Sequence, residues 1–239
     1  MPLDLRAYDH LLLDMNGTFL FGFDRFGPGE DFGATYARAG YAALAPADAH
    51  RRVRAAYDYL AARYVDEAYY HRFPSVAEAL RATGAHPVTA AAEAELVDTF
   101  ALHELGYLPD AHAAALRALA GLRPISVLSN LWAPKPRWLA RLGDYGVRGL
   151  FAHLLFSSDG AEMKPHPRLF ARAVGAIGSA PQRILYVGDS YRCDVVGATG
   201  AGLDAVYLAG AERPATRVPA RPGLVAVYPD LPAFVADVS

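Results

Sequence analysis

The second half of the sequence alternates between short apolar runs and longer stretches whose apolar residues recur at helical spacing. The apolar runs are 125–128, 150–156, 184–187, 205–208 and 224–228, and the helix-like stretches are 111–122, 136–142, 167–177, 194–201 and 231–238. Strands that alternate with helices pair in parallel, because each return to the sheet needs a crossover. A parallel sheet is covered by helices on both faces. The sequence therefore predicts an α/β fold in three layers.

One further apolar run lies near the start, where His10 to Leu13 leads directly into Asp14. In open parallel sheets, chemistry collects just beyond the carboxyl ends of the strands. Asp14 is thereby expected where a nucleophile would sit. Taken alone, the Asn16-Gly17 pair between apolar residues indicates a two-residue hairpin equally well, and the rest of the chain has to decide between the two interpretations.

Composition and charge narrow the functional classes. With 239 residues, of which 53% are hydrophobic and 20% charged, the chain suits one large globular domain or a domain with an insertion. The formal net charge is −2 and no long basic stretch occurs, which argues against nucleic acid and an anionic membrane surface as partners. We expect a small-molecule substrate.

The cellular setting is expected to be reducing. Cys193 is the single cysteine, so an internal disulfide cannot form. The first residues lack the basic and apolar regions of a leader, and no apolar run of about eighteen residues occurs. These features predict a cytoplasmic protein without a membrane span.

A helical insertion is predicted after the first strand. Residues 19–33 carry several glycines among aromatic residues and are typical of a flap with a hinge. Residues 34–105 are rich in Ala, Arg, Glu and Leu and favour about four helices, with prolines near their starts at positions 46, 74 and 87. Residues 106–110 then indicate a second hinge. We therefore expect a core formed by residues 1–20 and 106–239, and an insertion formed by residues 21–105.

Two polar signals follow the insertion. Ser129-Asn130 comes directly after an apolar run, where a hydroxyl can hold a phosphoryl or carboxylate oxygen, although in isolation a helix cap or a turn is the better explanation of the pair. Lys164 precedes a helix that begins near Pro167, and Lys135 is the other lysine of the chain. A cation near Asp14 would keep that carboxylate ionised and would neutralise a bound anion.

The last signal is the stretch from Val187 to Asp194. A buried-type strand again ends in a carboxylate, at Asp189, and a second carboxylate, Asp194, follows five residues later. With Asp14, these acids would form a site of hard oxygen ligands, which Mg²⁺ accepts. Three converging carboxylates require a cation, so we expect Mg²⁺ as cofactor.

These segments occur in a specific order. Asp14-Met15-Asn16-Gly17-Thr18, Ser129-Asn130, Lys164-Pro165-His166-Pro167, and Gly188-Asp189 with Asp194 together resemble the four ordered motifs of the haloacid dehalogenase-like hydrolase superfamily. The resemblance extends from about residue 9 to residue 208. It implies a Rossmann-like core with a helical cap between the first and second motifs. The gap of about 115 residues between Asp14 and Ser129 agrees, since it far exceeds what one crossover needs.

The resemblance also implies a role for each motif residue. Asp14 would attack phosphorus and form an aspartyl-phosphate, and Ser129 would bind a phosphoryl oxygen. Lys164 would bridge Asp14 and the substrate. Asp189 would hold Mg²⁺ together with Asp14 and the main-chain carbonyl of Asn16, and Asp194 would help to hold the metal or would orient Lys164. The implied activity is hydrolysis of a small phosphorylated metabolite.

The sequence departs from the family pattern at Asn16, where phosphatases of this superfamily carry an aspartate that acts as general acid and base. An amide cannot exchange a proton at neutral pH, and loss of a general acid or base typically costs on the order of 10²–10⁴ in rate. A substrate with a good leaving group, a chain that stalls at the intermediate, or a different reaction would each account for Asn16.

Alternative functions stay open at this stage. Phosphonatase-like members need a lysine in the cap, and residues 21–105 contain none. Haloacid dehalogenases lack the second aspartate, as this chain does, but they need no metal. Asp189 indicates a metal site and therefore argues against a dehalogenase. A phosphate-binding or regulatory protein with weak catalysis is a third possibility. Besides Ser129, Asn130 and Lys164, the candidate substrate contacts are Phe21, Phe23, Arg25, Arg52, Tyr59, Arg63, His71 and Trp132. The oligomeric state is not predicted.

Overall fold

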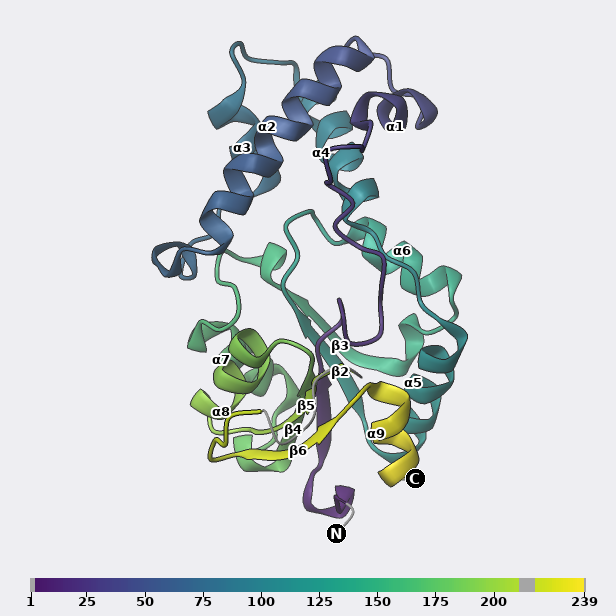
Figure 1. Cartoon of the computed structure of the whole chain (residues 1–239), viewed down its shortest axis with the longest axis vertical. Coiled ribbons are helices and arrows are strands. Elements are labelled where there is room, and N and C mark those ends of the chain that lie inside the picture. Colours follow the sequence, from purple (N-terminus) through teal and green to yellow (C-terminus); the bar gives the residue numbers. More distant parts are fainter. Residues whose placement is uncertain (1–2, 211–217, 239) are drawn as a thin grey trace.

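The computed structural model describes residues 3–210 and 218–238 and contains a six-stranded parallel sheet (Figure 1). The strands are β1 (His10–Leu13), β2 (Ile125–Ser129), β3 (Phe151–Phe156), β4 (Ile184–Gly188), β5 (Asp204–Leu208) and β6 (Leu224–Tyr228). Their order across the sheet is β3-β2-β1-β4-β5-β6, and every neighbouring pair is parallel. The predicted α/β fold with a parallel sheet is thus confirmed.

Helices cover both faces of this sheet. They are α5 (Asp110–Leu122), α6 (Pro136–Asp144), α7 (Pro167–Ile177), α8 (Gly197–Gly200) and α9 (Leu231–Val238). Buried residues of α5, α6 and α9 belong to one hydrophobic cluster, and those of α7 and α8 belong to another. The two clusters fill opposite faces of the sheet, which gives the three layers expected from the sequence (Figure 1).

Strand β1 lies at the centre of the sheet and does not form a hairpin with the residues after Gly17. Its neighbours are β2 and β4, and Leu11 is in register with Ile125 on one side and Leu185 on the other. All four residues of β1 are buried. The hairpin interpretation is therefore wrong, because an apolar strand gains more by burial on both faces than a two-stranded ribbon can provide.

Four α-helices lie between β1 and α5, a stretch that the structure describes completely. They are α1 (Phe32–Arg38), α2 (Pro46–Tyr64), α3 (Val76–Thr83) and α4 (Ala90–Glu104). Pro46 begins α2, and α3 begins after a capping box between Ser75 and Glu78. These helices bury a hydrophobic cluster of their own and lie together beyond one end of the sheet (Figure 1).

Two connecting segments join the helical insertion to the sheet, and they lie side by side. Main-chain hydrogen bonds run in both directions between Phe21 and Tyr107, with N···O distances of 2.9 and 2.8 Å. A Cβ atom on Gly106 would lie 2.6 Å from the carbonyl oxygen of Phe21, so a side chain at that position would push the segments apart. Glycine at position 106 allows this close approach.

Three details complete the comparison with the sequence. The helix expected over 194–201 begins earlier, as a π-helical turn over Tyr191–Val196 that continues into α8. Residues 213–222 are rich in proline and arginine, from which the sequence predicts a loop, and part of this loop, at 213–217, lies outside the described residues. Within the described part of the chain, no helix has the length and apolar character needed to span a membrane.

Candidate active site

Two central strands bring the first two carboxylates together. Asp14 follows β1 and Asp189 follows β4, and these strands are hydrogen-bonded neighbours. The loop after β1 approaches Asp189 so closely that a Cβ atom on Gly17 would lie 2.2 Å from a carboxylate oxygen of Asp189. Gly17 also has φ +85°, in the left-handed region that favours glycine. Gly17, which the hairpin interpretation placed in a turn, thus allows the loops after β1 and β4 to approach each other closely.

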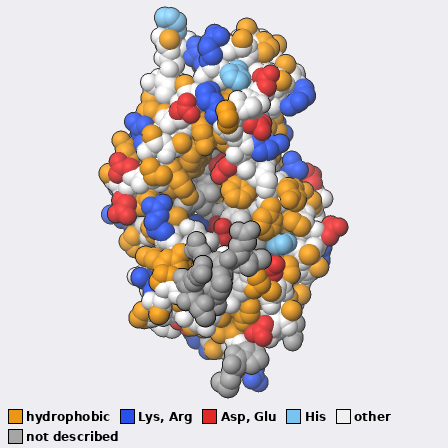
Figure 2. Space-filling model, in the orientation of Figure 1, with side chains coloured by type: hydrophobic (Ala, Val, Ile, Leu, Met, Phe, Trp, Pro, Cys, Tyr) orange, Lys and Arg blue, Asp and Glu red, His pale blue; other side chains and the backbone are white. Residues whose placement is uncertain are grey.

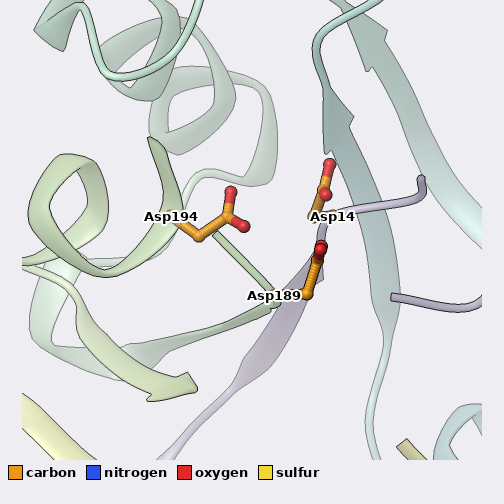
Figure 3. A group of neighbouring side chains, drawn as sticks. All are labelled: Asp14, Asp189 and Asp194. Atoms are coloured by element: carbon orange, nitrogen blue, oxygen red, sulfur yellow. The ribbon is translucent and has the colours of Figure 1, made fainter. Parts of the chain in front are cut away.

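Asp194 reaches the same point from the π-helical turn, and all three carboxylates converge in Figure 3. One side-chain oxygen from each of the three acids lies within 4.8 Å of the others. Asp194 packs against the end of β4, where a Cβ atom on Gly188 would come within 2.4 Å of its carboxylate. The main-chain N–H of Ser190 donates to Asp194 Oδ2 at 2.8 Å, which fixes the direction of this side chain.

Lys164 is buried beside these carboxylates. Its Nζ donates to Asp14 Oδ1 and to Asp194 Oδ1, both at 2.7 Å. It also donates to the hydroxyl of Tyr186 at 2.9 Å, and Tyr186 in turn donates to the main-chain oxygen of Leu128 at 3.1 Å. The ammonium group thereby has three oxygen partners, which use its full donor capacity.

Electrostatics keep Lys164 charged in spite of its burial. Burial alone would lower the pKa of the ammonium group, but the adjacent carboxylates of Asp14 and Asp194 raise it well above its usual value. For Asp189, burial and then the charges of Asp14 and Asp194 raise the pKa to about 8. One lysine therefore does not balance the three carboxylates, and a bound cation would relieve their repulsion.

The acidic cluster fits a hard divalent cation by its donor set. All three side chains offer carboxylate oxygens, and the only hydrogen bond that the described residues give to Asp189 comes from the Thr18 hydroxyl, at 3.1 Å. Asp194, in contrast, has both oxygens engaged by protein donors. Asp14 and Asp189 therefore have the greater freedom to coordinate a metal.

The second motif supports the lysine. Asn130 donates from Nδ2 to the main-chain oxygen of Lys164 at 3.1 Å and accepts from the main-chain N–H of Lys164 at 2.8 Å. This pair of hydrogen bonds fixes the backbone from which the lysine side chain extends. Ser129, at the end of β2, is buried and lines the same cavity as Lys164.

A cavity of about 410 Å³ opens onto these residues, and a hollow is visible in the middle of the face drawn in Figure 2. Its lining consists of Asp14, Asn16, Phe23, Asp24, Tyr57, Ala61, Tyr64, Val65, Glu104, Ser129, Asn130, Trp132, Lys164, Asp189, Ser190 and Cys193. The volume suits a small metabolite. The polar motifs and the helical insertion thus contribute to one site.

The side chain of Asn16 stands out in the lining. Its Oδ1 atom is buried and has no hydrogen-bond partner among the described residues. A buried acceptor without a donor is costly, so the amide is built to meet something that enters the cavity. This is the position at which the family pattern expects a proton-transferring acid.

The other candidate contacts divide into two groups. Phe23 and Trp132 line the cavity. The remaining six are absent from its described lining, and several are engaged elsewhere: Arg52 pairs with Asp48 at 3.0 Å, and Arg63 lies 3.3 Å from the ring centre of Tyr59.

Several residues of the site had no signal of function in the sequence. Tyr186 lies inside the apolar run of β4, where an aromatic residue is expected in any buried strand. Tyr57, Tyr64 and Glu104 lie in ordinary amphipathic helical sequence. Only the path of the chain brings them to the cavity.

Two curated phosphatases are similar in sequence to parts of this chain. A phosphoserine phosphatase of Thermus thermophilus is 33% identical over 139 residues, which cover 57% of this chain and 54% of the relative. A glyceraldehyde 3-phosphate phosphatase of Methanothermobacter thermautotrophicus is 33% identical over 84 residues, covering 35% and 36% of the two chains. The chain thus spans about half, or less, of the length of these curated relatives.

Solved structures share the fold over nearly the whole chain. An HAD phosphatase from Thermococcus onnurineus matches with a TM-score of 0.59 at 18% identity and covers 94% of each chain. A 2-haloacid dehalogenase from Pseudomonas syringae pv. Tomato DC3000 matches with a TM-score of 0.65 at 19% identity, covering 96% of this chain and 97% of the other. At this identity, the likeness speaks for the fold alone.

The family model of haloacid dehalogenase-like hydrolases matches residues 8–202, which include all four sequence motifs. This stretch also contains every residue of the buried cluster around Lys164. The chain therefore belongs to the haloacid dehalogenase-like hydrolase family.

Proposed function

We propose that this hydrolase is a Mg²⁺-dependent phosphatase of a small phosphorylated metabolite, with Asp14 as the nucleophile. One observation carries the proposal: a buried lysine and three carboxylates converge at the end of the central strands, beside a cavity. The names of the phosphatase relatives agree with this reading.

Each of several residues of the chain would have a separate role in such a reaction. Asp14 Oδ1 is held by Lys164, which leaves the second oxygen to attack phosphorus and form an aspartyl-phosphate. Ser129 would bind a phosphoryl oxygen in the cavity, and the positive charge of Lys164 would offset the negative charge of the phosphoryl group. Asp194 holds Lys164 in place, because its Oδ1 accepts from the ammonium group and its Oδ2 from the main chain.

Mg²⁺ would be held by Asp14, Asp189 and the main-chain carbonyl of Asn16, with Asp194 as an adjacent negative charge. When bound, it supplies positive charge that offsets the phosphoryl oxygens and the crowded carboxylates. The raised pKa of Asp189 reflects this crowding and supports a cation at the site.

Asn16 shapes the choice of substrate. An amide cannot protonate a departing alkoxide or activate water as a base. The proposal therefore favours esters and anhydrides whose leaving groups need little protonation. The unpartnered Oδ1 of Asn16 is free to accept a hydrogen bond from the attacking water.

A dehalogenase is the second candidate, because the dehalogenases of this family also lack an aspartate at the position of Asn16. The acidic cluster speaks against it, because Asp14, Asp189 and Asp194 together call for a cation that dehalogenases do not need. A catalytically weak phosphate-binding protein is the third candidate. The complete hydrogen-bond network of Lys164 is better explained by turnover.

We also propose that residues 1–20 and 106–239 form the catalytic core and that residues 21–105 form a flap and cap over the cavity. The separate hydrophobic cluster of α1–α4 supports this division. A cytoplasmic location is part of the proposal, on the grounds of the single cysteine.

The test is turnover by the purified chain, with and without Mg²⁺, of 4-nitrophenyl phosphate, acetyl phosphate, glycerol phosphate and 2-chloropropionate. We expect metal-dependent phosphate release, fastest on the first two compounds. Halide release without metal would make the chain a dehalogenase. Absence of turnover on the whole panel would favour the binding protein.

The nucleophile is tested by Asp14→Asn, which keeps the size of the side chain and removes its nucleophilic oxygen. We expect turnover to fall by at least about 10³-fold, with an unchanged circular dichroism spectrum. The control is Asp58→Asn, which makes the same chemical change on the exposed face of α2 and retains activity. Activity of Asp14→Asn near the parent level would contradict the assignment.

A further inference from the structure

The cavity has two walls of different chemistry. The motif residues form one wall, beside Asp14. The other lining residues, called here the distal wall, are Phe23, Asp24, Tyr57, Ala61, Tyr64, Val65, Glu104 and Trp132. The distal wall faces the part of the substrate that is not the phosphoryl group, so its chemistry decides which leaving groups fit.

Aromatic rings make up much of the distal wall. The ring of Trp132 lies between those of Tyr57 and Tyr64, with centroid distances of 5.7 and 5.4 Å. Tyr57 is held in turn by a stacked ring, Phe26, at 4.5 Å. The main-chain N–H of Trp132 donates to Glu104 at 2.7 Å, which fixes the loop that carries the indole. The distal wall therefore contains three aromatic residues that pack against one another and line the cavity.

Two carboxylates accompany these rings. Asp24 and Glu104 are adjacent, because the main-chain N–H of Asp24 donates to the main-chain oxygen of Glu104 at 3.4 Å. Neither carboxylate has a cationic partner among the described residues; Asp24 is exposed, whereas burial raises the pKa of Glu104 to about 8. Asp24 also has φ +54°, which is rare for a residue with a side chain and marks a backbone held by its surroundings.

Cations are missing from the distal wall as far as the structure describes it. Lys164, among the motif residues, is the one basic residue in the described lining, and its donors are already engaged. Of the arginines nearby in sequence, Arg25 donates to the main-chain oxygen of Leu102, and Arg63 lies over Tyr59. Arg54 lies over the ring of Tyr57, and its own donors are engaged by the main-chain oxygens of Phe26 and Gly27. A carboxylate or a second phosphate on the leaving group would have no partner here.

We propose that the substrate is the phosphate monoester of an amino alcohol, whose ammonium group lies between Asp24 and the aromatic rings of Tyr64 and Trp132. This inference rests on the proposed phosphatase function and deepens it. Aromatic faces attract ammonium groups, most strongly where water is excluded. The ligand would also supply the positive charge that Asp24 lacks.

The same substrate class suits Asn16. An alkoxide with a neighbouring ammonium group is less basic than a simple alkoxide, so it departs with less help from an acid. In the reaction, the ester P–O bond breaks as the phosphoryl group passes to Asp14, and the amino alkoxide takes its proton from water. A water molecule then cleaves the aspartyl-phosphate and releases inorganic phosphate.

The test compares substrates of one shape and different charge. The pair is phosphocholine and 3,3-dimethylbutyl phosphate, in which carbon replaces the quaternary nitrogen. With Mg²⁺, we expect kcat/KM to be at least tenfold higher for phosphocholine. Phosphoethanolamine separates a primary from a quaternary ammonium, and phosphoserine adds a carboxylate that should lower kcat/KM at least tenfold relative to phosphoethanolamine. Equal kcat/KM for the matched pair, or a preference for phosphoserine, would overturn the proposal.

The residue assignment is tested by Asp24→Asn, with Asp58→Asn as the matched control. Within Asp24→Asn, the ratio of kcat/KM between phosphocholine and its neutral isostere should fall toward one, whereas Asp58→Asn should keep the parent ratio. A ratio measured within one variant does not depend on how much of that variant is folded. An unchanged ratio in Asp24→Asn would overturn the role of Asp24.

Calorimetry separates this inference from the proposed function. If the parent chain does not hydrolyse even 4-nitrophenyl phosphate, the phosphatase proposal fails. Binding of phosphocholine and 3,3-dimethylbutyl phosphate to Asp14→Asn still tests the ammonium site, because a binding measurement needs no turnover. Binding of phosphocholine at least tenfold tighter than its isostere supports the ammonium site, and equal binding refutes it.

Discussion

At the scale of single residues, Asn16 is where this chain departs from the family pattern and where one atom changes the chemistry. Replacing Asn16 by Asp puts a carboxyl group beside three existing carboxylates. Their charges would raise the pKa of the new group and favour the protonated form that a general acid needs. The neighbourhood is thus already suited to an acid at position 16.

We predict that Asn16→Asp raises kcat on alkyl phosphates such as glycerol phosphate by about 10²-fold or more, the usual contribution of a general acid. The gain on 4-nitrophenyl phosphate should be much smaller, because its leaving group needs no proton. Asn16→Ala serves as the control, since it removes the amide without adding an acid. An equal gain on both esters, or no gain, would mean that the cavity is built for other chemistry.

The residues whose roles could be expected from sequence share one property: each follows or precedes a regular element at a point where packing does not demand its type. Asp14, Lys164 and Asp189 are of this kind. Tyr186 is not, because alternation along a buried strand hides a functional hydroxyl among core side chains. The proximity of Asp24 and Glu104 could not be predicted, because it depends on the turn that brings the flap against the end of α4.

At the scale of the element, β1 combines a fully buried position with a titratable residue. His10 is 6% exposed, and its Nε2 lies 2.8 Å from the hydroxyl of Ser126 on β2. Burial, followed by the nearby His153, lowers the pKa of His10 to about 4. The folded chain therefore binds a proton at His10 less readily than the unfolded chain, in which the pKa is about 6.5.

We predict that this strand loses stability as the pH falls. Between about pH 6.5 and 4 the unfolded chain takes up a proton at His10 that the folded chain refuses, so the free energy of unfolding decreases by about 3 kcal/mol across this window and is unaffected by His10 above it. Urea denaturation at a series of pH values measures this. His10→Gln should show a smaller loss than the parent, whereas His71→Gln, at an exposed position, should follow the parent curve. Parallel curves for His10→Gln and the parent would contradict the prediction.

Element boundaries show what sequence periodicity can and cannot specify. Strands and most helices were predictable because apolar spacing reports burial directly. The π-helical turn over Tyr191–Val196 was not, since its extra residue per turn is imposed by Asp194, which turns back toward Ser190 and Lys164. Irregular helical turns of this kind occur frequently at functional sites.

At the scale of the whole molecule, the helical insertion is tied directly to the loop that carries Lys164. The main-chain N–H of Phe73 donates to the oxygen of Ala161 at 2.7 Å, and that of Met163 donates to the oxygen of Tyr70 at 3.0 Å. These contacts join two segments about ninety residues apart in the chain. A ligand in the cavity therefore meets both parts of the molecule at once.

Metal binding depends on folding, because Asp14 and Asp189 of the acidic cluster come together only in the folded chain. We predict that Mg²⁺ at about one hundred times its dissociation constant stabilises the fold by about 2.7 kcal/mol. For a chain of this size that raises Tm by roughly 5–10 °C, and EDTA should reverse the rise. Asp189→Asn removes a carboxylate that has one hydrogen-bond partner among the described residues, and it should abolish the response, whereas Asp58→Asn, on the exposed face of α2, should retain it. An equal rise in Tm for both variants would show that Mg²⁺ acts elsewhere on the molecule, and the three carboxylates would then need another explanation for their convergence.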